Sequence, residues 1–416
     1  MTMTSSAFRP AVLLAHPTGN QNVRNALRSL GEHGMLAEFW TGIAWNPESK
    51  WHRLLPSRLR SQLGRRTFEY APQDRIHSVP SREMVRLGAT LLHLQRVVCS
   101  GELPFSIVGI YRHLDRQVAR RLRDIHVDAV YCYEGGALRS FQEARQRNVK
   151  AICEVQSSHW RWWSNLLDEE RERNPEFASL VPRVSDLAGH FQDKDEELAL
   201  ADVVVVPSTH VRNTLGGIVA EENIRVISYG APPVRNRLPR SGETSRPLKI
   251  LFVGQLSQSK GIGYLLDAVD RLGAEVELTM VGRRLRAHPR VDEACNHWRW
   301  FESLPHSEVM NLMVEADVLV LPSLAEGCAL VVLEALACGV PVIVTPNTGT
   351  LSFIEDGCQG FIVPICSADA IAERLNSLSR DRDLLAAMSH QAQIAAAAQS
   401  WDAYRENWAQ TLRAAL

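Results

Sequence analysis

The chain has 416 residues, and its 46 lysines and arginines almost balance its 47 aspartates and glutamates. Because a near-neutral chain has no overall positive field that would attract nucleic acid, we expect no nucleic-acid partner. A hydrophobic share of 45% and a charged share of 22% are typical of a soluble globular protein. The length exceeds that of one ordinary hydrophobic core and predicts two domains of roughly 200 residues each.

The eight cysteines are scattered along the chain, without a C-x-x-C pair or a Cys/His cluster at metal-ligand spacing. We therefore expect reduced thiols. The N-terminus lacks a charged region followed by a long apolar core, so no signal peptide is expected. No apolar run reaches the roughly 18 residues of a membrane-spanning helix. The sequence predicts a cytoplasmic protein.

Short β-rich runs alternate with longer helical patterns along the chain, which is typical of parallel α/β domains. Several of these runs are apolar nearly throughout, as in strands covered on both faces. In the first half, strands are expected at 11–15, 129–133, 151–155, 203–206 and 225–228. In the second half, they are expected at 249–253, 275–281, 318–321, 340–344 and 360–363.

Glycine and small polar residues follow the first expected strand, in the segment 15–22. Such residues let a ligand reach the carboxyl edge of the sheet, where open α/β sheets bind their ligands. The alternative for Asn20 is a plain N-cap of the first helix.

The stretch 50–66 holds six lysines and arginines and no acidic residue. Apolar residues recur every four positions in it, at Trp51, Leu55, Leu59 and Leu63. A helix with this pattern is apolar on one side and basic on the other, and each cation near anionic lipid adds about 1 kcal/mol of binding. This pattern indicates peripheral association with the inner face of a membrane. The alternative is a basic helix, interrupted at Pro56, that covers its own domain's core.

Aromatic residues follow the third expected strand, at Trp160, Trp162 and Trp163. We expect them to pack between the domains. The alternative is a platform for a sugar or an isoprenoid chain.

A segment rich in Pro, Arg and Ser without periodicity, 236–247, is predicted to link the domains. The N-terminal domain then covers 1–235 and the C-terminal domain covers 248–399. The last segment, 400–416, carries apolar residues at helical spacing and is expected to pack back across the first domain. These residues are Trp401, Tyr404, Trp408 and Leu412.

The strand at 249–253 leads into Gly254 and a turn that ends with Lys260 before a helix. A glycine at a strand end lets a ligand approach the backbone, and a lysine before the helix neutralises a phosphate. The alternative is an ordinary βα turn with an exposed lysine.

Two glutamates, Glu326 and Glu334, flank a turn between the strand at 318–321 and a helix expected to end near Gly339. Free N–H groups at the start of that helix form a site for phosphate. Two carboxylates on either side of such a site suit a nucleotide-sugar, with one near the sugar and one at the ribose diol. The alternative is a plain strand–turn–helix with two surface glutamates.

Three motifs occur in order: Gly-x-Leu-x-x-x-Lys-Gly from Gly254, Pro-Ser-x-x-Glu-Gly from Pro322, and Glu-Ala-x-Ala-x-Gly-x-Pro-Val from Glu334. This arrangement resembles the retaining glycosyltransferases of family 4, with the GT-B fold. The similarity covers nearly all of 248–395 and continues more weakly at 206–208 and 226–230. The resemblance implies two Rossmann-like domains facing across a cleft, with the donor nucleotide in the C-terminal one. It implies transfer of a sugar from a UDP or GDP sugar to a glycan or lipid-linked acceptor, with no metal required.

The resemblance also implies roles for single residues. Lys260 would bind the donor diphosphate, Glu334 the ribose hydroxyls, and Glu326 would contact the transferred sugar. Gly254 and Gly282 would lie against the nucleotide, and Gly19 and Asn20 would face it across the cleft. The backbone amides of the turn and first helical residues would cradle the phosphates; these are Gly327, Cys328, Ala329, Leu330 and Val331.

The chain departs from the family pattern at three positions. Gln255 stands where an arginine is usual, and Arg283 or Arg284 is a candidate to replace that charge. Ala329 stands where a second glycine is usual. The family's active-site histidine corresponds best to Gln156, so that His159 is either its catalytic substitute or a local hydrogen-bonding residue. These departures keep a second function open, a catalytically weak scaffold or regulatory protein of GT-B fold.

Overall fold

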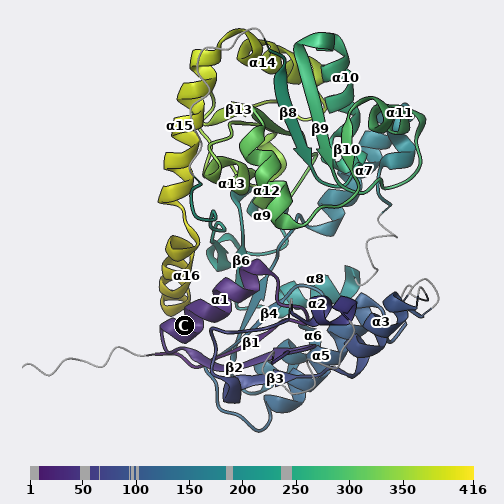
Figure 1. Cartoon of the computed structure of the whole chain (residues 1–416). Helices are drawn as coiled ribbons and strands as arrows, with labels where there is room; N and C mark the ends of the chain where they lie inside the picture. Colours follow the sequence, from purple (N-terminus) through teal and green to yellow (C-terminus); the bar gives the residue numbers. More distant parts are fainter. Residues whose placement is uncertain are drawn as a thin grey trace, which may run out of the picture.

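The structure is a computed structural model that describes residues 9–46, 57–64, 66–92, 94, 98–99, 103–183, 191–235 and 246–416. It consists of two lobes stacked one above the other, each built on a parallel β-sheet with helices on its faces (Figure 1). The predicted α/β class and the two parallel sheets are therefore confirmed.

The N-terminal lobe holds a seven-stranded sheet in the order β3-β2-β1-β4-β5-β6-β7. The direction of chain progression reverses beside β1, which makes the carboxyl edge there a natural place for a ligand. The strands are β1 (Val12–Ala15), β2 (Leu36–Thr41), β3 (Ile76–Ser78), β4 (Ala129–Tyr133), β5 (Lys150–Glu154), β6 (Val203–Val206) and β7 (Ile224–Val226).

The helices of this half of the chain are α1 (Gln21–Glu32), α2 (Ser57–Gly64), α3 (Ser81–Leu91), α5 (Ile107–Arg121), α6 (Leu138–Gln146), α7 (Trp160–Arg173), α8 (Phe191–Leu200) and α9 (Thr209–Thr214). Short 3₁₀ turns lie at η2 (Gln73–Arg75), η3 (Pro175–Leu180) and η5 (Glu221–Asn223).

The C-terminal lobe holds a six-stranded sheet in the order β10-β9-β8-β11-β12-β13. Its strands are β8 (Leu248–Val253), β9 (Val276–Val281), β10 (Arg299–Phe301), β11 (Val318–Leu321), β12 (Val342–Val344) and β13 (Gly360–Ile362). The helices of the second half are α10 (Ile262–Leu272), α11 (Pro289–His297), α12 (His306–Glu315), α13 (Leu330–Ala337), α14 (Ala368–Arg380), α15 (Arg382–Ala398) and α16 (Trp401–Ala415). Its 3₁₀ turns are η6 (Gln258–Lys260), η7 (Gly273–Glu275) and η8 (Pro346–Thr348).

All ten predicted strands are present, with ends shifted by at most two residues. Three further strands, β2, β3 and β10, were not predicted. Strand β2 contains Glu38, which breaks the apolar pattern but is buried beside Arg121, whose Nη2 lies 2.6 Å from its carboxylate. Strands β3 and β10 have only three residues each and leave too short a pattern to recognise.

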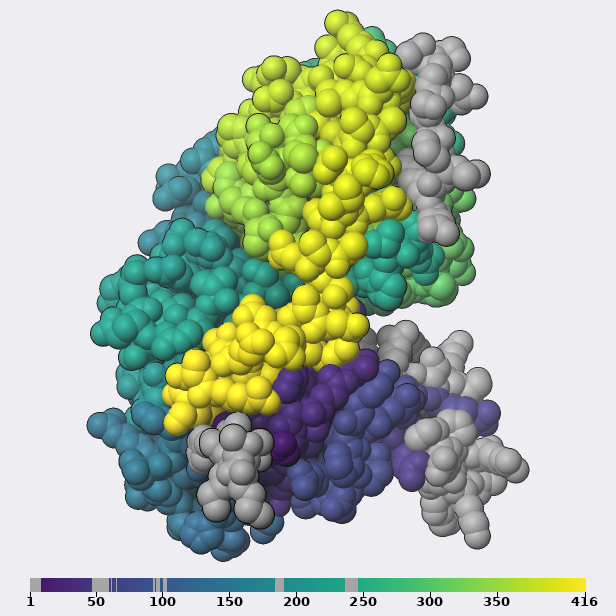
Figure 2. All heavy atoms as spheres, turned by 90° about the vertical axis from the view of Figure 1, so that its left-hand side faces the viewer, coloured from purple at the N-terminus to yellow at the C-terminus, as the bar shows by residue number. Residues whose placement is uncertain are grey.

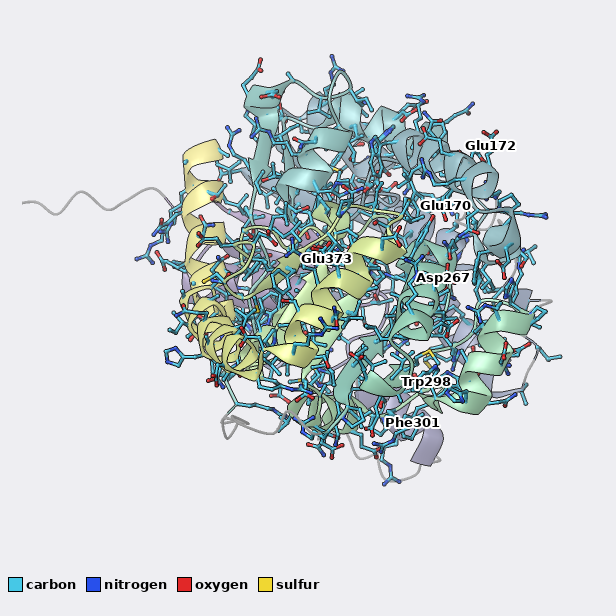
Figure 3. All side chains as sticks on the ribbon, turned by 90° about the horizontal axis from the view of Figure 1, so that it is seen from above. Glu170, Glu172, Asp267, Trp298, Phe301 and Glu373 are labelled. Carbon is cyan, nitrogen blue, oxygen red and sulfur yellow. The ribbon has the colours of Figure 1, made fainter. Side chains whose placement is uncertain are left out.

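Helix α7 follows a strand of the N-terminal sheet but packs on the C-terminal lobe (Figure 1). Its Glu170 is completely buried and accepts hydrogen bonds from Gln258 Nε2 at 2.7 Å and from the Tyr264 hydroxyl at 2.8 Å. In the following turn, the ring of Phe177 stacks on His288 with 4.9 Å between centroids. Seen from above, Glu170 lies on the same side of the molecule as helix α10 (Figure 3). Residues 160–180 therefore link the two lobes.

The C-terminal segment crosses the outside of both lobes (Figure 2). Helix α15 packs against α13 of the upper lobe, and α16 packs against α1 of the lower lobe. The apolar residues predicted to form the buried face of this last helix are all buried, namely Trp401, Tyr404, Trp408 and Leu412. The helix at 400–416 therefore covers the N-terminal lobe.

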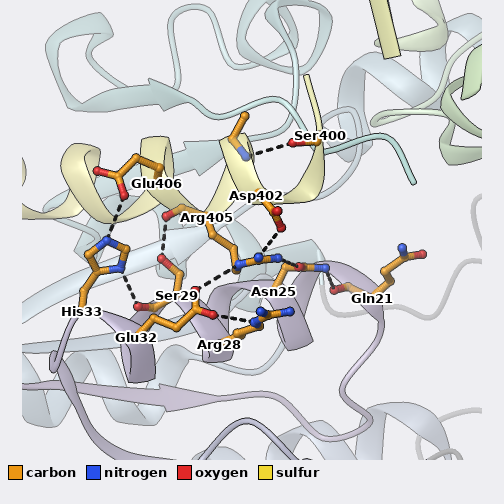
Figure 4. Close-up of polar contacts among 11 residues, drawn as sticks. Gln21, Asn25, Arg28, Ser29, Glu32, His33, Ser400, Asp402, Arg405 and Glu406 are labelled. Carbon is orange, nitrogen blue, oxygen red and sulfur yellow. Dashed lines mark hydrogen bonds and ion pairs between the residues drawn. The ribbon is translucent and has the colours of Figure 1, made fainter. Parts of the chain in front are cut away.

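Polar contacts fix α16 to α1 (Figure 4). Ser29 Oγ donates to the carbonyl oxygen of Arg405 at 2.6 Å, and the Arg405 guanidinium reaches Asn25 Oδ1 at 3.0 Å and Glu32 Oε2 at 3.2 Å. Beside this helix, the chain passes from one lobe to the other twice. The two crossings are hydrogen-bonded to each other, since Ala231 N donates to Gln399 O at 2.8 Å.

The predicted linker and the basic stretch fall largely outside the described residues. Residues 236–245, 47–56 and 65 are not described, so the domain boundary and the interfacial helix stay predictions. Within α2, Leu63 is buried and packs with Ile43 and Leu87, as expected for a helix that covers its own domain. None of the helices that the structure describes is long and apolar enough to cross a membrane.

Candidate active site

A cavity of about 300 Å³ lies between the lobes. One side comes from the segments that follow β5, with Trp160, Trp163 and Lys194 among its residues. The other side comes from the turns that follow β8 and β11, with Lys260 and Glu326. Both halves of the chain thus contribute to one site at the carboxyl ends of parallel strands, where ligands of open α/β sheets bind.

Lys260 and Glu326, which lie 66 positions apart in the chain, meet at this cavity. The Nζ of Lys260 forms an ion pair with Oε1 of Glu326, and Ser323 Oγ donates to the same oxygen at 2.9 Å. Their side chains are 28% and 16% exposed. The pair is therefore accessible to a ligand, and the serine holds the carboxylate in place.

The turn before α13 is packed directly against the N-terminal lobe. A Cβ atom at Gly327 would lie 1.7 Å from the carbonyl oxygen of Gln156, so only glycine fits there. The carbonyl oxygen of Gly327 accepts a hydrogen bond from Ser208 Oγ at 2.7 Å. This residue therefore forms part of the contact between the lobes, and it also lines the cavity.

The amide cradle predicted at 327–331 is formed only in part. The N–H of Ala329, which caps α13, donates to the carbonyl oxygen of Thr348 at 3.0 Å and is already in use. Leu330 and Val331 open the helix, where N–H groups have no acceptor within the helix. Burial raises the pKa of the neighbouring Cys328 thiol to about 12, so this side chain is neutral.

Glu334 lies further along α13 and faces the first residue of α12. His306 Nε2 is 2.9 Å from Glu334 Oε1, and the two side chains are 69% and 16% exposed. A partly exposed carboxylate at this position is able to accept hydrogen bonds from a diol. The imidazole beside it was not predicted as a partner.

Gly254, Gln255 and Gly282 lie together at the ends of β8 and β9. A Cβ atom at Gly282 would lie 1.8 Å from the carbonyl oxygen of Gly254, so the two turns are in direct contact. The side chain of Gln255 is exposed. Both candidate arginines are exposed, but Arg284 pairs with Asp292 and lies over the ring of Trp300. Arg283 is thus the better placed replacement for the usual arginine.

In the N-terminal lobe, the loop after β1 is held by His16. Its Nδ1 accepts hydrogen bonds from the N–H groups of Thr18 and Gly19 at 3.1 and 3.0 Å. Burial lowers the pKa of His16 to about 3, which keeps the ring neutral and able to accept. Gly19 is covered by Phe68, and Asn20 Oδ1 accepts from Val23 N at 3.1 Å as the N-cap of α1. Asn20 therefore has the capping role that its alternative predicted.

His159 is enclosed at the start of α7 and does not line the cavity. Its side chain is 0% exposed, its Nε2 lies 3.1 Å from Asp195 Oδ1, and its Nδ1 accepts from Arg161 N. Burial lowers the pKa of His159, and Asp195 opposes that shift. This geometry favours the local hydrogen-bonding role over the catalytic one.

Residues of α8 also line the cavity, and no sequence pattern predicted them there. Phe191 stacks on Trp160 with 4.5 Å between ring centroids, and Lys194 Nζ pairs with Glu134 Oε2 at 3.0 Å. The sequence of α8 is typical of a polar surface helix. Only the packing of α8 in the fold brings these residues to the cavity. Among the described residues, no three His, Cys, Asp or Glu side chains are grouped so as to hold a metal ion.

Residues 235–395 match the family model of the glycosyl transferases group 1. This part of the chain, which carries Lys260, Glu326 and Glu334, is therefore similar to that family. The amylovoran biosynthesis glycosyltransferase AmsK of Erwinia amylovora is 30% identical over 175 residues, which are 38% of this chain and 42% of that protein. The phosphatidyl-myo-inositol mannosyltransferase of Mycolicibacterium smegmatis is 28% identical over 210 residues, 49% of each chain. The matches thus span less than half the length of these relatives.

Solved structures resemble the whole chain in fold. HepE of Anabaena, in complex with UDP, covers 97% of this chain and is itself covered completely, with a TM-score of 0.62 and 14% identity. The sucrose-phosphate synthase of Thermosynechococcus elongatus aligns with a TM-score of 0.67 and 17% identity. The alignment covers 97% of this chain and 98% of the synthase. The two-lobed chain therefore has the GT-B fold.

Proposed function

We propose that the protein is a retaining glycosyltransferase of family 4 that transfers a sugar from a nucleoside-diphosphate sugar to an acceptor hydroxyl. The observation that carries this proposal is the meeting of Lys260 and Glu326 at the cavity between the lobes. A cation and a carboxylate in one accessible site suit a ligand that joins an anionic diphosphate to a polyhydroxylated sugar.

In the proposed reaction, the bond between the anomeric carbon and the diphosphate oxygen breaks as the acceptor oxygen attacks from the same face. The acceptor's proton passes to the departing diphosphate oxygen. Lys260 and the N–H groups of Leu330 and Val331 stabilise the negative charge that builds there, so no metal ion is required. Glu326 holds hydroxyls of the transferred sugar and is not a covalent nucleophile, while Glu334 binds the ribose diol.

The names and ligands of the related proteins support the proposed transferase function. AmsK acts in amylovoran biosynthesis, and HepE was solved with UDP and with UDP-glucose. We therefore place this chain in polysaccharide or lipid-linked glycan synthesis, with UDP or GDP in its donor. Its place of action is the cytoplasm, where the basic stretch 50–66 would hold it at the inner face of an anionic membrane.

Titration calorimetry with UDP and GDP, followed by transfer assays with a panel of UDP and GDP sugars, tests the proposal. We expect one nucleotide to bind and Lys260→Ala to weaken it roughly 10- to 100-fold, because a charge-assisted contact contributes about 1.5–3 kcal/mol. Glu326→Ala should abolish most transfer. Lys249→Ala, at an exposed position of β8, is the matched control. Transfer rates within about twofold of the wild type for both site variants would show the assignment to be wrong.

The second candidate, a scaffold that keeps the fold without turnover, is favoured by one observation. Gln255 replaces the usual arginine, and its exposed amide supplies no charge to the diphosphate. Failure of both UDP and GDP to bind would select this function over the transferase.

A further inference from the structure

The cavity wall that faces Lys260 and Glu326 carries aromatic side chains. Trp160 and Trp163 come from the first turn of α7, and Phe191 is the first residue of α8. All three are partly exposed. Since the opposite wall holds the predicted donor residues, this wall lies on the acceptor's side.

Trp160 is fixed by an aromatic neighbour, a cation and a hydrogen bond. Phe191 stacks on it at 4.5 Å with 25° between the planes, and the Arg161 guanidinium lies over its ring at 4.7 Å. Its indole N–H donates to Asp195 Oδ1 at 2.9 Å. By contrast, no ring or cation among the described residues stacks on Trp163. Trp163 packs in part against the hydrophobic core and is partly exposed, so its exposed surface is the part of this wall that neither a ring nor a cation of the described residues covers.

The charges of the cavity are balanced in the absence of ligand. Lys194 is paired with Glu134, and Lys260 is paired with Glu326. Ser157, Ser158 and Ser259 also line the cavity, together with the aromatic residues. A neutral, polyhydroxylated ring with one apolar face fits such a wall better than a lipid phosphate, because Lys260 is assigned to the donor diphosphate and Lys194 is held by Glu134.

We propose that Trp163 is the platform of an acceptor subsite on which a pyranose ring of the acceptor stacks. The inference rests on the proposed function and specifies its acceptor as a saccharide unit. Trp163 and the predicted sugar-contacting residue Glu326 line the same cavity of about 300 Å³, near the lower end of the range for small-molecule sites. A stacked acceptor ring would therefore lie next to the donor sugar.

The test uses the full chain and simple probes. Methyl α-glucoside, methyl α-galactoside, methyl α-mannoside and dodecyl phosphate are titrated in the presence of UDP or GDP, with binding followed by ligand-observed NMR and tryptophan fluorescence. We expect at least one pyranoside to bind, and Trp163→Ala to weaken it about tenfold or more. Trp163→Phe, which keeps an aromatic face, should lose less.

Trp162→Ala is the matched control. Trp162 is the neighbouring residue on α7, but its ring contacts His210 with 5.0 Å between centroids and does not line the cavity. This variant should keep pyranoside affinity within about twofold. Retained nucleotide binding by Trp163→Ala shows that the variant is folded; if that variant does not fold, Trp163→Phe decides the comparison with Trp162→Ala.

Three results would overturn the inference. One is the absence of binding by every pyranoside to a wild-type protein that binds nucleotide. Another is an equal loss in the Trp162 and Trp163 variants. The third is Trp163-dependent binding of dodecyl phosphate in place of the pyranosides, which would assign the wall to a lipid phosphate. Failure of UDP and GDP to bind, with pyranoside binding at Trp163 retained, would instead overturn the transferase function alone.

Discussion

The ammonium group of Lys260 and the carboxylate of Glu326 form an ion pair on one wall of the cavity between the lobes. The turn after β8 supplies the cation, and the turn after β11 supplies the anion. Without a donor nucleotide, each group neutralises the other. A diphosphate that binds at Lys260 must compete with Glu326, which then becomes free to accept hydrogen bonds from sugar hydroxyls.

This competition predicts opposite effects of one substitution. Glu326→Gln removes the anion that competes for Lys260, so UDP or GDP should bind at least as tightly as to the wild type. Transfer should fall by roughly 10- to 100-fold, because the amide is a weaker acceptor for the sugar hydroxyls. Calorimetry and an assay of transfer measure the two effects separately. Weaker nucleotide binding in this variant would contradict the competition.

A second substitution restores the charge that the family usually has. The Gln255 side chain is exposed, so Gln255→Arg fits without displacing the core. We expect nucleotide binding to tighten by about tenfold, as for one added charge-assisted contact. Arg283→Ala should weaken binding, since Arg283 is the exposed cation nearest in sequence to Gly282. Unchanged affinity in Gln255→Arg would place the diphosphate away from the end of β8.

A third prediction concerns the link between the lobes at Glu170. This carboxylate is completely buried and accepts from Gln258, Tyr264 and the Cys366 thiol. Glu170→Ala would leave these donors unpaired, and the free energy of unfolding should fall by about 3 kcal/mol. Urea unfolding measures the loss. Glu172→Ala, an exposed position on the same helix, should change it by less than about 0.5 kcal/mol. Equal decreases in the free energy of unfolding of both variants would show that Glu170 does not stabilise the link between the lobes.

The sequence predicted those parts of the molecule that depend on local pattern. The apolar strands, the buried stripe of α16 and the turns that carry Lys260 and Glu326 are all where their residues indicated. The path of α7 was not predictable in this way, because the polar partners of Glu170 lie about 90 positions or more further along the chain. Burial of a charged residue by distant donors leaves no local periodicity.

The same limit applies to the candidate site. Phe191 and Lys194 reach the cavity only because α8 returns beside α7, and nothing in their own segment distinguishes them from surface residues. His16 lies within the predicted ligand loop 15–22, but its role depends on burial and on the hydrogen bonds that it accepts from Thr18 and Gly19. Packing therefore determines which of the candidate residues share one site.

A fourth prediction concerns acid. The pKa of His16 is lowered by burial from its usual 6.5 to about 3. Between these values the unfolded chain binds a proton that the folded chain does not, so stability falls as the pH decreases. The loss from this residue is about 2 kcal/mol between pH 7 and pH 5. The His16→Asn variant should be less stable than the wild type at pH 7. Its free energy of unfolding should decrease less between pH 7 and pH 5.

Denaturant unfolding at pH 7, 6 and 5 measures this decline. His210, whose pKa burial lowers to about 4, adds a second contribution in the same direction. His390→Asn, at an exposed position of α15, is the control and should follow the wild type. An identical decline in His16→Asn would show that His16 does not contribute to acid sensitivity.

The two passages of the chain between the lobes, at Ala231 and Gln399, are tied by a backbone hydrogen bond and bend as one. Separation of the lobes beside α16 would break that bond. On the opposite flank, the buried hydrogen bonds of Glu170 hold α7 against α10, so the lobes are joined there as well (Figure 1). Fluorophores on α7 and α10 should therefore keep a nearly constant separation.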